Sequence, residues 1–403
     1  MKNMEKRSVF FSIVIILGFL LPHSSLFFLI LNPIMWATLL FLNRAETKRS
    51  WIFFPAVIGL ILSVSANFLD PATTELKTLG RLGTLILYLS IFPISGKEAI
   101  PIKTLYFLIF VIVGSQLAFA FNISPAISVI EKIWPYEGEG EIYQTEFLIG
   151  RAEYIDSPFG NFRWGGLYRN PNQCVRYVSV ILAAFLLETK NSPMRRKFLF
   201  YFICAISVLL SGSRTGFIIC AALVLFDLIF FRKKMWAKWL AIGMSLGGAL
   251  FMALSSSLKG NYRVLDLESG LSESMGTKIS WFFTYLTSLG PWEFLFGAIS
   301  PKYINQYGIP MLDSEWGYYF YLYGIIASLG LLISIGLVWK NGGSNTRFFM
   351  IVSLWGMTSS ILLANRMSFI FLLFLSVYFC KDKRESILNK RLPYDYKTIR
   401  NRQ

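Results

Sequence analysis

Apolar residues occur along the chain in separate runs, most of them about as long as a membrane-spanning helix. A helix needs about 20 consecutive, mainly apolar residues to cross the hydrocarbon core of a bilayer. The pattern predicts an all-α, polytopic integral membrane protein with about 12 transmembrane helices, forming one membrane domain over residues 1–403. The predicted helices cover residues 9–22, 24–42, 51–69, 78–95, 101–121, 171–187, 198–213, 216–231, 237–256, 316–339, 347–364 and 367–380.

Composition supports this class, because 55% of the residues are hydrophobic and only 15% are charged. The formal net charge of +16 raises the question of a nucleic-acid partner, which the distribution of Lys and Arg answers. If the N-terminus is cytoplasmic, the segments that face inward hold 26 of the 39 Lys and Arg residues. This bias follows the positive-inside rule, so we expect both termini in the cytoplasm and no nucleic-acid partner. On this interpretation the inner side carries only charges that set topology, in segments 1–8, 43–50, 95–103, 188–197, 232–238, 340–347 and 381–403.

Two connections are long, and the predicted topology makes both extracytoplasmic: residues 122–170 and 257–315. Long loops in a compact fold are usually functional. Residues 381–403 form a basic cytoplasmic tail in this prediction. The four cysteines lie in or beside apolar runs without CxxC spacing, and the chain has one histidine. We therefore expect the cysteines to be small core residues, and we predict no disulfide frame or metal site.

A first cluster of candidate site residues is "RWGGLYRNPNQCVRYVSVI", residues 163–181. Asn170 and Pro171 have the preferences of an N-cap and a first helical residue, so a helix is predicted to begin there. Its free backbone N–H groups and positive dipole end would lie beside Arg169, and Arg176 falls on nearly the same helical face. Together with Arg163, these residues predict an anion site at the outer side of the membrane.

The glycine pair in this stretch, Gly165 and Gly166, would let another backbone approach closely. The alternative for Arg163 and Arg169 is that they extend to lipid phosphates, as arginines near helix ends commonly do. Arg176 lies inside the predicted helix, which favours a functional role or a buried pair.

A second cluster, "LLSGSRTGF" (209–217), is predicted to be an outward hairpin with Arg214 at its apex. The flanking runs are barely long enough to span a bilayer, so the apex is expected to dip into the membrane and line a cavity. A simple exposed turn is the alternative.

The third cluster, "GIPMLDSEWGYYFYLYG" (308–324), follows the second long loop and contains Asp313, Glu315 and Tyr318. The carboxylates are candidates for a general base, and the aromatic rings for stacking on sugars. Acidic residues in a first helical turn also simply favour the helix dipole, which is the alternative. Arg366 adds a cation near the outer end of the last helix pair.

These three clusters fall on one side of the predicted membrane. Arginines, carboxylates and aromatic rings together suit a lipid-linked, phosphorylated glycan. Guanidinium groups can bind a diphosphate in a bidentate way, so the chemistry requires no metal and no cofactor.

The stretches "RWGGLYRNPNQCVRYVSVI", "LLSGSRTGFII" and "LDSEWGYYFYLYGIIASLGLL" together resemble the O-antigen polymerase/ligase family of bacterial membrane proteins, which includes the Wzy-type polymerases. The resemblance covers residues 160–380 in order and spacing and includes a G-x-x-x-N-P-N pattern. It implies a glycosyltransferase of the inner membrane that moves a glycan from undecaprenyl diphosphate to an acceptor. Polymerases use a second lipid-linked repeat unit as acceptor, whereas ligases use lipid A core.

The resemblance also assigns roles to residues. Ligases of the family carry a histidine in the loop before the helix that starts near Glu315, and this loop has none, which favours a polymerase. A lipid-linked oligosaccharide flippase is the rival from another class. The expected partners are an undecaprenyl-diphosphate-linked oligosaccharide, membrane lipids and a chain-length regulator protein. The resemblance implies that Arg163, Arg169, Arg176 and Arg214 hold the diphosphate. The residues themselves indicate further candidates: Asn170, Asn172, Tyr318 and Arg366 for substrate, and Asp313 and Glu315 for catalysis.

Overall fold

The computed structural model describes residues 2–20, 26–42, 51–68, 76–90, 92–93, 99–133, 164–168, 171–231, 280, 283–284, 286–287, 289–297, 315–356 and 365–391. Within these ranges the chain is mostly helical and has no strand, so the predicted all-α class is confirmed. The α-helices are α1 (Lys2–Leu20), α2 (Leu26–Leu42), α3 (Phe54–Phe68), α4 (Leu76–Ser90), α5 (Ile102–Ala120), α6 (Ser124–Ile133), α8 (Pro171–Glu188), α9 (Met194–Ser211), α10 (Arg214–Phe226), α13 (Pro291–Phe296), α15 (Glu315–Asn341), α16 (Ser344–Gly356) and α17 (Asn365–Arg391). Short 3₁₀ turns η1 (Trp51–Phe53) and η3 (Gly166–Tyr168) and the π-helical turn η4 (Asp227–Phe231) complete the described elements.

Every predicted span except 237–256, which lies outside the described residues, overlaps a helix of the structure. Two differences are clear. The short helices α6 and α13 occupy parts of the two predicted loops, and α17 continues to Arg391, so the predicted tail 381–403 begins as helix. Two segments, Ile102–Ala120 and Tyr319–Asn341, are long and apolar enough to cross a membrane.

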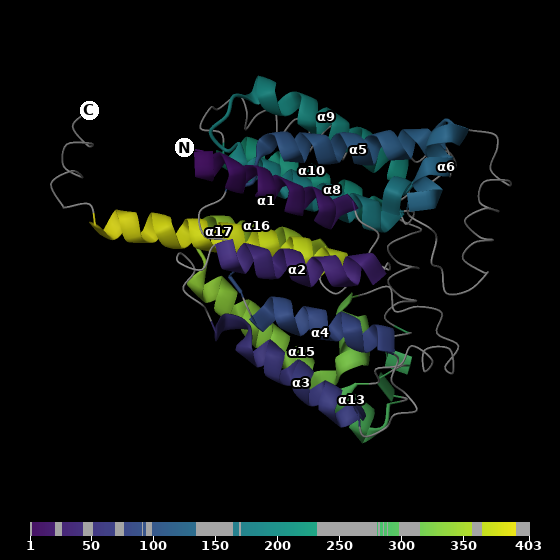
Figure 1. Cartoon of the computed structure of the whole chain (residues 1–403), viewed down its shortest axis with the longest axis vertical. Helices are drawn as coiled ribbons and strands as arrows, with labels where there is room; N and C mark the ends of the chain where they lie inside the picture. The colour runs from purple at the N-terminus through teal and green to yellow at the C-terminus, as the bar shows by residue number, and fades with distance from the viewer. Residues whose placement is uncertain are drawn as a thin grey trace.

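The long helices run in similar directions and form one bundle (Figure 1). In this view α1, α5, α8, α9 and α10 occupy the upper part, α2, α16 and α17 the middle, and α3, α4 and α15 the lower part. The start of α1 and the end of α17 lie at the left end of the bundle, whereas α6 and α13 lie at the right end. The elements from the two predicted outer loops therefore share one end of the bundle, opposite the start of α1 and the end of α17.

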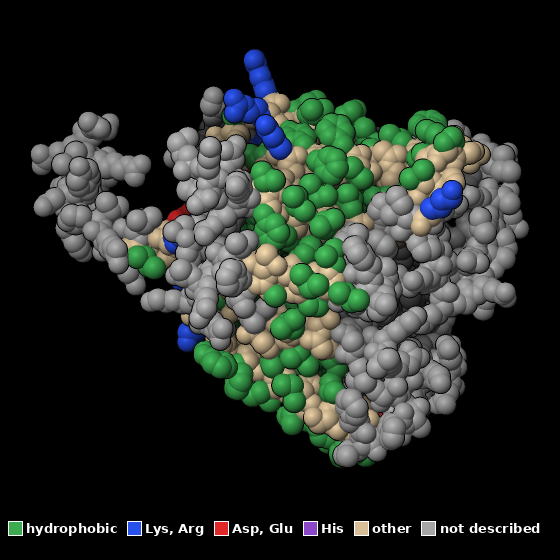
Figure 2. Space-filling view, in the orientation of Figure 1, with side chains coloured by type: hydrophobic (Ala, Val, Ile, Leu, Met, Phe, Trp, Pro, Cys, Tyr) green, Lys and Arg blue, Asp and Glu red, His purple; other side chains and the backbone are tan. Residues whose placement is uncertain are grey.

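The bundle has an apolar interior and an apolar exterior. One large hydrophobic cluster connects helices from α1 to α17. The outward faces are also rich in large apolar side chains, such as Phe110 (53% exposed), Phe202 (56%) and Ile333 (55%). Figure 2 shows hydrophobic side chains across the middle of the molecule, while most visible Lys and Arg side chains lie toward the left end. Helices at a water surface ordinarily carry polar residues on the outer face, and here that face is apolar.

Helices α3 and α15 pack through small residues. A Cβ on Gly59 would lie 2.7 Å from Ala327 Cα, and a Cβ on Gly330 would lie 2.3 Å from the carbonyl oxygen of Pro55. Ala56 N–H also donates to Ser334 Oγ at 3.2 Å. Close backbone approach through small residues is the usual way in which membrane helices pack.

Helix α15 is broken at Gly324, where the backbone has φ 72° and ψ −177°. A Cβ at this position would lie 2.3 Å from the carbonyl oxygen of Leu295, so the backbones of α13 and α15 are in contact. Ser63 Oγ and Asn67 Nδ2 of α3 donate to the Phe296 carbonyl oxygen at 2.5 and 3.2 Å. The start of α15, which carries the third predicted cluster, is thus fixed against α13 and α3.

Candidate functional site

Arg176, in the first turns of α8, is the predicted site arginine whose side chain is among the described residues. Helix α8 begins at Pro171, so the predicted helix start is confirmed. Arg176 lies about 7.5 Å further along the helix axis, and it is only 7% exposed. Its neighbours Val175 and Tyr177 belong to the hydrophobic core. Because a guanidinium is a permanent cation, this degree of burial is costly unless polar or anionic groups meet it.

The segment before α8, residues 164–168, is fixed by hydrogen bonds to α5 and α9. Trp164 N–H donates to the Leu210 carbonyl oxygen at 2.8 Å. Gln116 Nε2 donates to the Trp164 carbonyl oxygen at 2.8 Å and to the Ser207 carbonyl oxygen at 3.1 Å. Gln116 Oε1 accepts from Ser207 Oγ at 2.6 Å. The buried amide of Gln116 therefore connects three separate parts of the chain.

Gly166 lets this segment contact α5 directly. Its φ is 58°, a left-handed conformation that glycine adopts without a steric penalty. A Cβ there would lie 2.3 Å from Ser115 Oγ, which accepts a hydrogen bond from Leu167 N–H at 3.0 Å. The close backbone approach predicted at the glycine pair is thus made at Gly166, toward α5.

An aromatic stack joins the end of the same segment to α8. The rings of Tyr168 and Tyr177 are 4.0 Å apart between centroids and nearly parallel, at 10°. Tyr168 OH donates to the Phe19 carbonyl oxygen of α1 at 3.2 Å. Tyr168 precedes Arg169 in the chain, and Tyr177 follows Arg176. The stack therefore holds the end of the segment beside the turn of α8 that carries Arg176.

The second predicted cluster is a tight connection between α9 and α10, as the predicted hairpin requires. Gly212 ends α9 with φ 58° and ψ 22°. Ser213 is the N-cap of α10, and its side chain accepts from Gly216 N–H at 3.3 Å. Arg214 is the first residue of α10.

Helices α8 and α10 are in contact at the level of the two arginine positions. A Cβ on Gly216 would lie 1.9 Å from Val175 Cγ1, so α10 packs directly on α8 there. Arg214 precedes this contact by two residues on α10, and Arg176 follows it by one on α8. We call this region, residues 164–168, 171–177 and 211–216, the arginine end. Arg163, Arg169 and Asn170 lie outside the described residues, as do the side chains of Asn172 and Arg214.

The third predicted cluster is described only in part. Helix α15 begins at Glu315, and Tyr319 and Tyr323 of its first turns form an edge-to-face pair with centroids 4.9 Å apart. Arg366 is the second residue of α17. Asp313 and the side chains of Glu315, Tyr318 and Arg366 lie outside the described residues, so the predicted catalytic and substrate contacts stay predictions.

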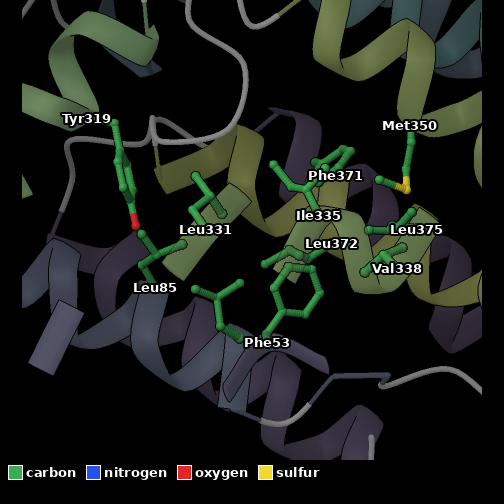
Figure 3. Close-up of a pocket in the computed structure, with 11 residues that line it drawn as sticks. Phe53, Leu85, Tyr319, Leu331, Ile335, Val338, Met350, Phe371, Leu372 and Leu375 are labelled. Carbon is green, nitrogen blue, oxygen red and sulfur yellow. The ribbon is translucent and has the colours of Figure 1, made fainter. Parts of the chain in front are cut away.

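A pocket between α4, α15, α16 and α17 lies close to this cluster (Figure 3). The pocket is small, and it is lined by apolar side chains such as Leu85, Leu331 and Phe371. The hydroxyl of Tyr319 is buried at its edge without a hydrogen-bond partner among the described residues. The pocket suits apolar groups better than charged or sugar groups.

Two buried charged side chains at the other end of the same helices form an ion pair. Lys197 of α9 and Asp227 after α10 are both 0% exposed and form an ion pair with Nζ and Oδ1 2.5 Å apart. Tyr201 OH donates to Asp227 Oδ2 at 2.7 Å. The sequence pattern assigns Lys197 to the charges that only set topology. That assignment is wrong, because the Lys197 side chain is buried in an ion pair with Asp227.

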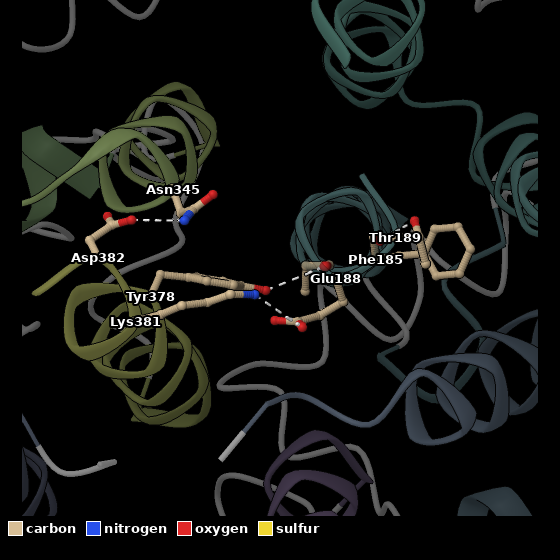
Figure 4. Close-up of polar contacts among 8 residues, drawn as sticks. Phe185, Glu188, Thr189, Asn345, Tyr378, Lys381 and Asp382 are labelled. Carbon is tan, nitrogen blue, oxygen red and sulfur yellow. Dashed lines mark hydrogen bonds and ion pairs between the residues drawn. The ribbon is translucent and has the colours of Figure 1, made fainter. Parts of the chain in front are cut away.

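Two more contacts at this end join α8, α16 and α17 (Figure 4). Lys381 Nζ lies 3.4 Å from Glu188 Oε2, at the end of α8. Burial raises the pKa of the Glu188 carboxyl above its ordinary value, and Lys381 opposes this shift. Asp382 accepts hydrogen bonds from Asn345 Nδ2 at 2.7 Å, Thr346 N–H at 2.8 Å and Thr346 Oγ1 at 2.6 Å, so it caps the start of α16. We call Glu188, Lys197, Asp227, Lys381 and Asp382 the ion-pair end.

Sequence reasoning missed Gln116 and Asp227 as organising residues. Each is a polar side chain in a predicted apolar run, at 101–121 and 216–231. A polar or ionisable residue inside such a run usually has a specific partner in the bundle. That signal was present in the sequence, although the identity of the partners was not.

Three cysteines, Cys174, Cys204 and Cys220, are buried, which agrees with their predicted place in the core, and Cys380 is partly buried. No protein-family model matches the chain, and no curated protein matches it in sequence.

Proposed function

We propose that the chain is a polytopic membrane glycosyltransferase of the O-antigen polymerase type in the bacterial inner membrane. In this proposal it transfers a growing glycan from undecaprenyl diphosphate to the non-reducing end of a new lipid-linked repeat unit. The observation that carries the proposal is Arg176. This cation is 7% exposed on α8, where α10 with Arg214 at its start packs through Gly216. Two cation-bearing helix starts at one end of an apolar bundle suit a lipid-borne diphosphate.

The proposed reaction is a displacement at the anomeric carbon of the growing chain. A hydroxyl of the acceptor sugar forms the new glycosidic bond while the bond from the anomeric carbon to the diphosphate oxygen breaks. The acceptor proton goes to a carboxylate, for which Asp313 and Glu315 are the candidates, and undecaprenyl diphosphate leaves as an anion. Arg176 and Arg214 stabilise the negative charge that develops on the leaving diphosphate.

The apolar exterior and the apolar pocket support this proposal over the flippase alternative. Exposed Phe110, Phe202 and Ile333 suit contact with acyl chains, which supports a multi-pass location. A flippase would need polar groups through the depth of a central cavity, whereas the pocket between α4 and α15 is lined by apolar side chains (Figure 3).

The proposal is tested by complementing a deletion strain with Arg176→Ala or Arg214→Ala and separating the surface glycans on a gel. We expect folded protein in the membrane and only single-repeat glycans. Arg195→Ala is the matched control, since Arg195 is exposed at the start of α9, and it should give the normal ladder. Long-chain ladders from both arginine-end variants would reject the proposal. Free polymer in the deletion strain would indicate a ligase.

A further inference from the structure

The segment before α8 has two neutral polar contacts with α5, a helix in which the sequence indicates no site residue. Gln116 donates to the Trp164 carbonyl oxygen, and Ser115 Oγ accepts from Leu167 N–H. Gln116 is 0% exposed and Ser115 is 6% exposed. Both N–H groups of the Gln116 amide donate, to the carbonyl oxygens of Trp164 and Ser207, and its Oε1 accepts from Ser207 Oγ.

The Gln116 partners Trp164 and Ser207 lie in two chain segments that lead to arginine-bearing helices. Trp164 follows Arg163 in the sequence, and its backbone is held between Gln116 and Leu210. Ser207 lies on the last turns of α9, which lead through a short connection to Arg214. One amide therefore sets the position of the segment before α8 relative to the helix that leads into α10.

A buried amide with this many partners is a rigid contact. Few other groups are available in an apolar bundle, so each lost bond would leave a carbonyl or an N–H unsatisfied. The segment also lies tightly against α5, because a Cβ on Gly166 would overlap Ser115 Oγ. A shift in the Gln116 contact would therefore move the segment as a whole.

We infer that Ser115 and Gln116 are positioning residues for the diphosphate site, which thereby extends into α5. The inference rests on the proposed function above. Neither residue touches the ligand in this role. They fix the segment 164–168 relative to the helices that carry Arg176 and Arg214, and a diphosphate bound by several guanidinium groups needs these groups at a fixed spacing.

The test uses the full-length protein in nanodiscs of phosphatidylethanolamine and phosphatidylglycerol. Binding of undecaprenyl diphosphate and of undecaprenyl monophosphate is measured for wild type, Gln116→Leu, Ser207→Ala and Arg176→Ala, with the thermal unfolding midpoint of each. We expect Gln116→Leu to weaken diphosphate binding at least about tenfold, and to reduce the preference for diphosphate over monophosphate. A residue with a purely structural role would lower the midpoint and leave that preference unchanged.

Ser353→Ala is the matched control for Ser207→Ala. Both serines are 0% exposed, but Ser353 Oγ donates to the Phe349 carbonyl oxygen within its own helix. We expect Ser207→Ala to reduce the preference for diphosphate and Ser353→Ala to leave it unchanged. If Gln116→Leu does not fold, the contrast between the two serine variants decides the inference.

The outcomes separate this inference from the proposed function. If Arg176→Ala weakens diphosphate binding while Gln116→Leu and Ser207→Ala match wild type, the positioning role is wrong and the diphosphate site stands. If wild type does not prefer the diphosphate, or Arg176→Ala binds it as wild type does, the proposed function is wrong and the positioning role falls with it.

Discussion

The two ends of helix α8 are built from different kinds of interaction. At the ion-pair end, opposite charges hold helices together, as in the buried pair of Lys197 and Asp227. At the arginine end, an amide, hydroxyls and an aromatic stack hold the segment before α8, and Arg176 lies next to them. We propose that the buried pair of Lys197 and Asp227 stabilises the fold, whereas Arg176 binds the ligand. Removing the charge of Lys197 should therefore reduce stability, and removing that of Arg176 should reduce activity.

The largest loss of stability is expected from breaking the buried ion pair. Lys197→Met should lower the free energy of unfolding by about 3–5 kcal/mol, because it leaves the Asp227 carboxyl buried without its cation. The double variant Lys197→Met/Asp227→Leu should recover most of this loss, since no charge is then left unpaired. Thermal unfolding in detergent measures both. A single variant as stable as wild type would contradict the structural role given to the pair.

A smaller loss is expected at the cap of α16. Asp382→Ala removes three hydrogen bonds and leaves the Thr346 N–H without its acceptor, which should cost about 2–3 kcal/mol. Asn345→Ala removes one of the three and should cost about 1 kcal/mol. The same unfolding measurement applies. Equal effects from the two variants would show that Asp382 does not cap the helix.

The contact between α8 and α10 tests the arginine end. Gly216→Ala places a Cβ against Val175 and should cost about 1–3 kcal/mol while shortening the glycan ladder, because the arginine-bearing helices separate. Adding Val175→Ala should restore both. Gly83→Ala is the control, since nothing lies within 4 Å of a Cβ there, and it should leave the ladder unchanged. A normal ladder from Gly216→Ala would show that this spacing does not matter.

The smallest effect is expected for Glu188, because its partner Lys381 is 28% exposed. The pair should contribute at most about 1 kcal/mol. Because burial raises the folded-state pKa of Glu188 above its unfolded value, the protonated carboxyl favours the folded state, and this stability is fully present below the unfolded pKa. It is lost as the pH rises through the raised pKa. Glu188→Gln should remove this part of the pH dependence, and an unchanged profile of unfolding midpoint against pH would contradict the shift.

Hydrophobic patterning predicted most helices, because each apolar run lies within one helix and residues next to the run mark where that helix begins or ends. Pro171 marks the start of α8, and Gly212 marks the end of α9. The break at Gly324 was not predicted, since it depends on the backbone of α13 lying against α15. The extension of α17 to Arg391 was missed because its residues are charged, and their stabilising partners lie on α8 and α16.

The candidate site was predictable only where chemistry and local structure coincide. Arg176 stands out because it is a cation inside an apolar helix, and Arg214 because it follows a Ser-Gly turn. Gln116 could not be assigned, because its partner Ser207 is 91 positions away in the chain. Contacts between helices that are far apart in the chain depend on how the helices pack. The spacing of residues in a single sequence does not reveal these contacts.

The most direct test of the account is a cryo-electron microscopy structure of the protein in nanodiscs with undecaprenyl diphosphate. The account predicts diphosphate density at the arginine end, with phosphate oxygens about 2.7–2.9 Å from the guanidinium nitrogens of Arg176 and Arg214. Density for the diphosphate elsewhere in a well-resolved map, with these two side chains turned away from it, would contradict it.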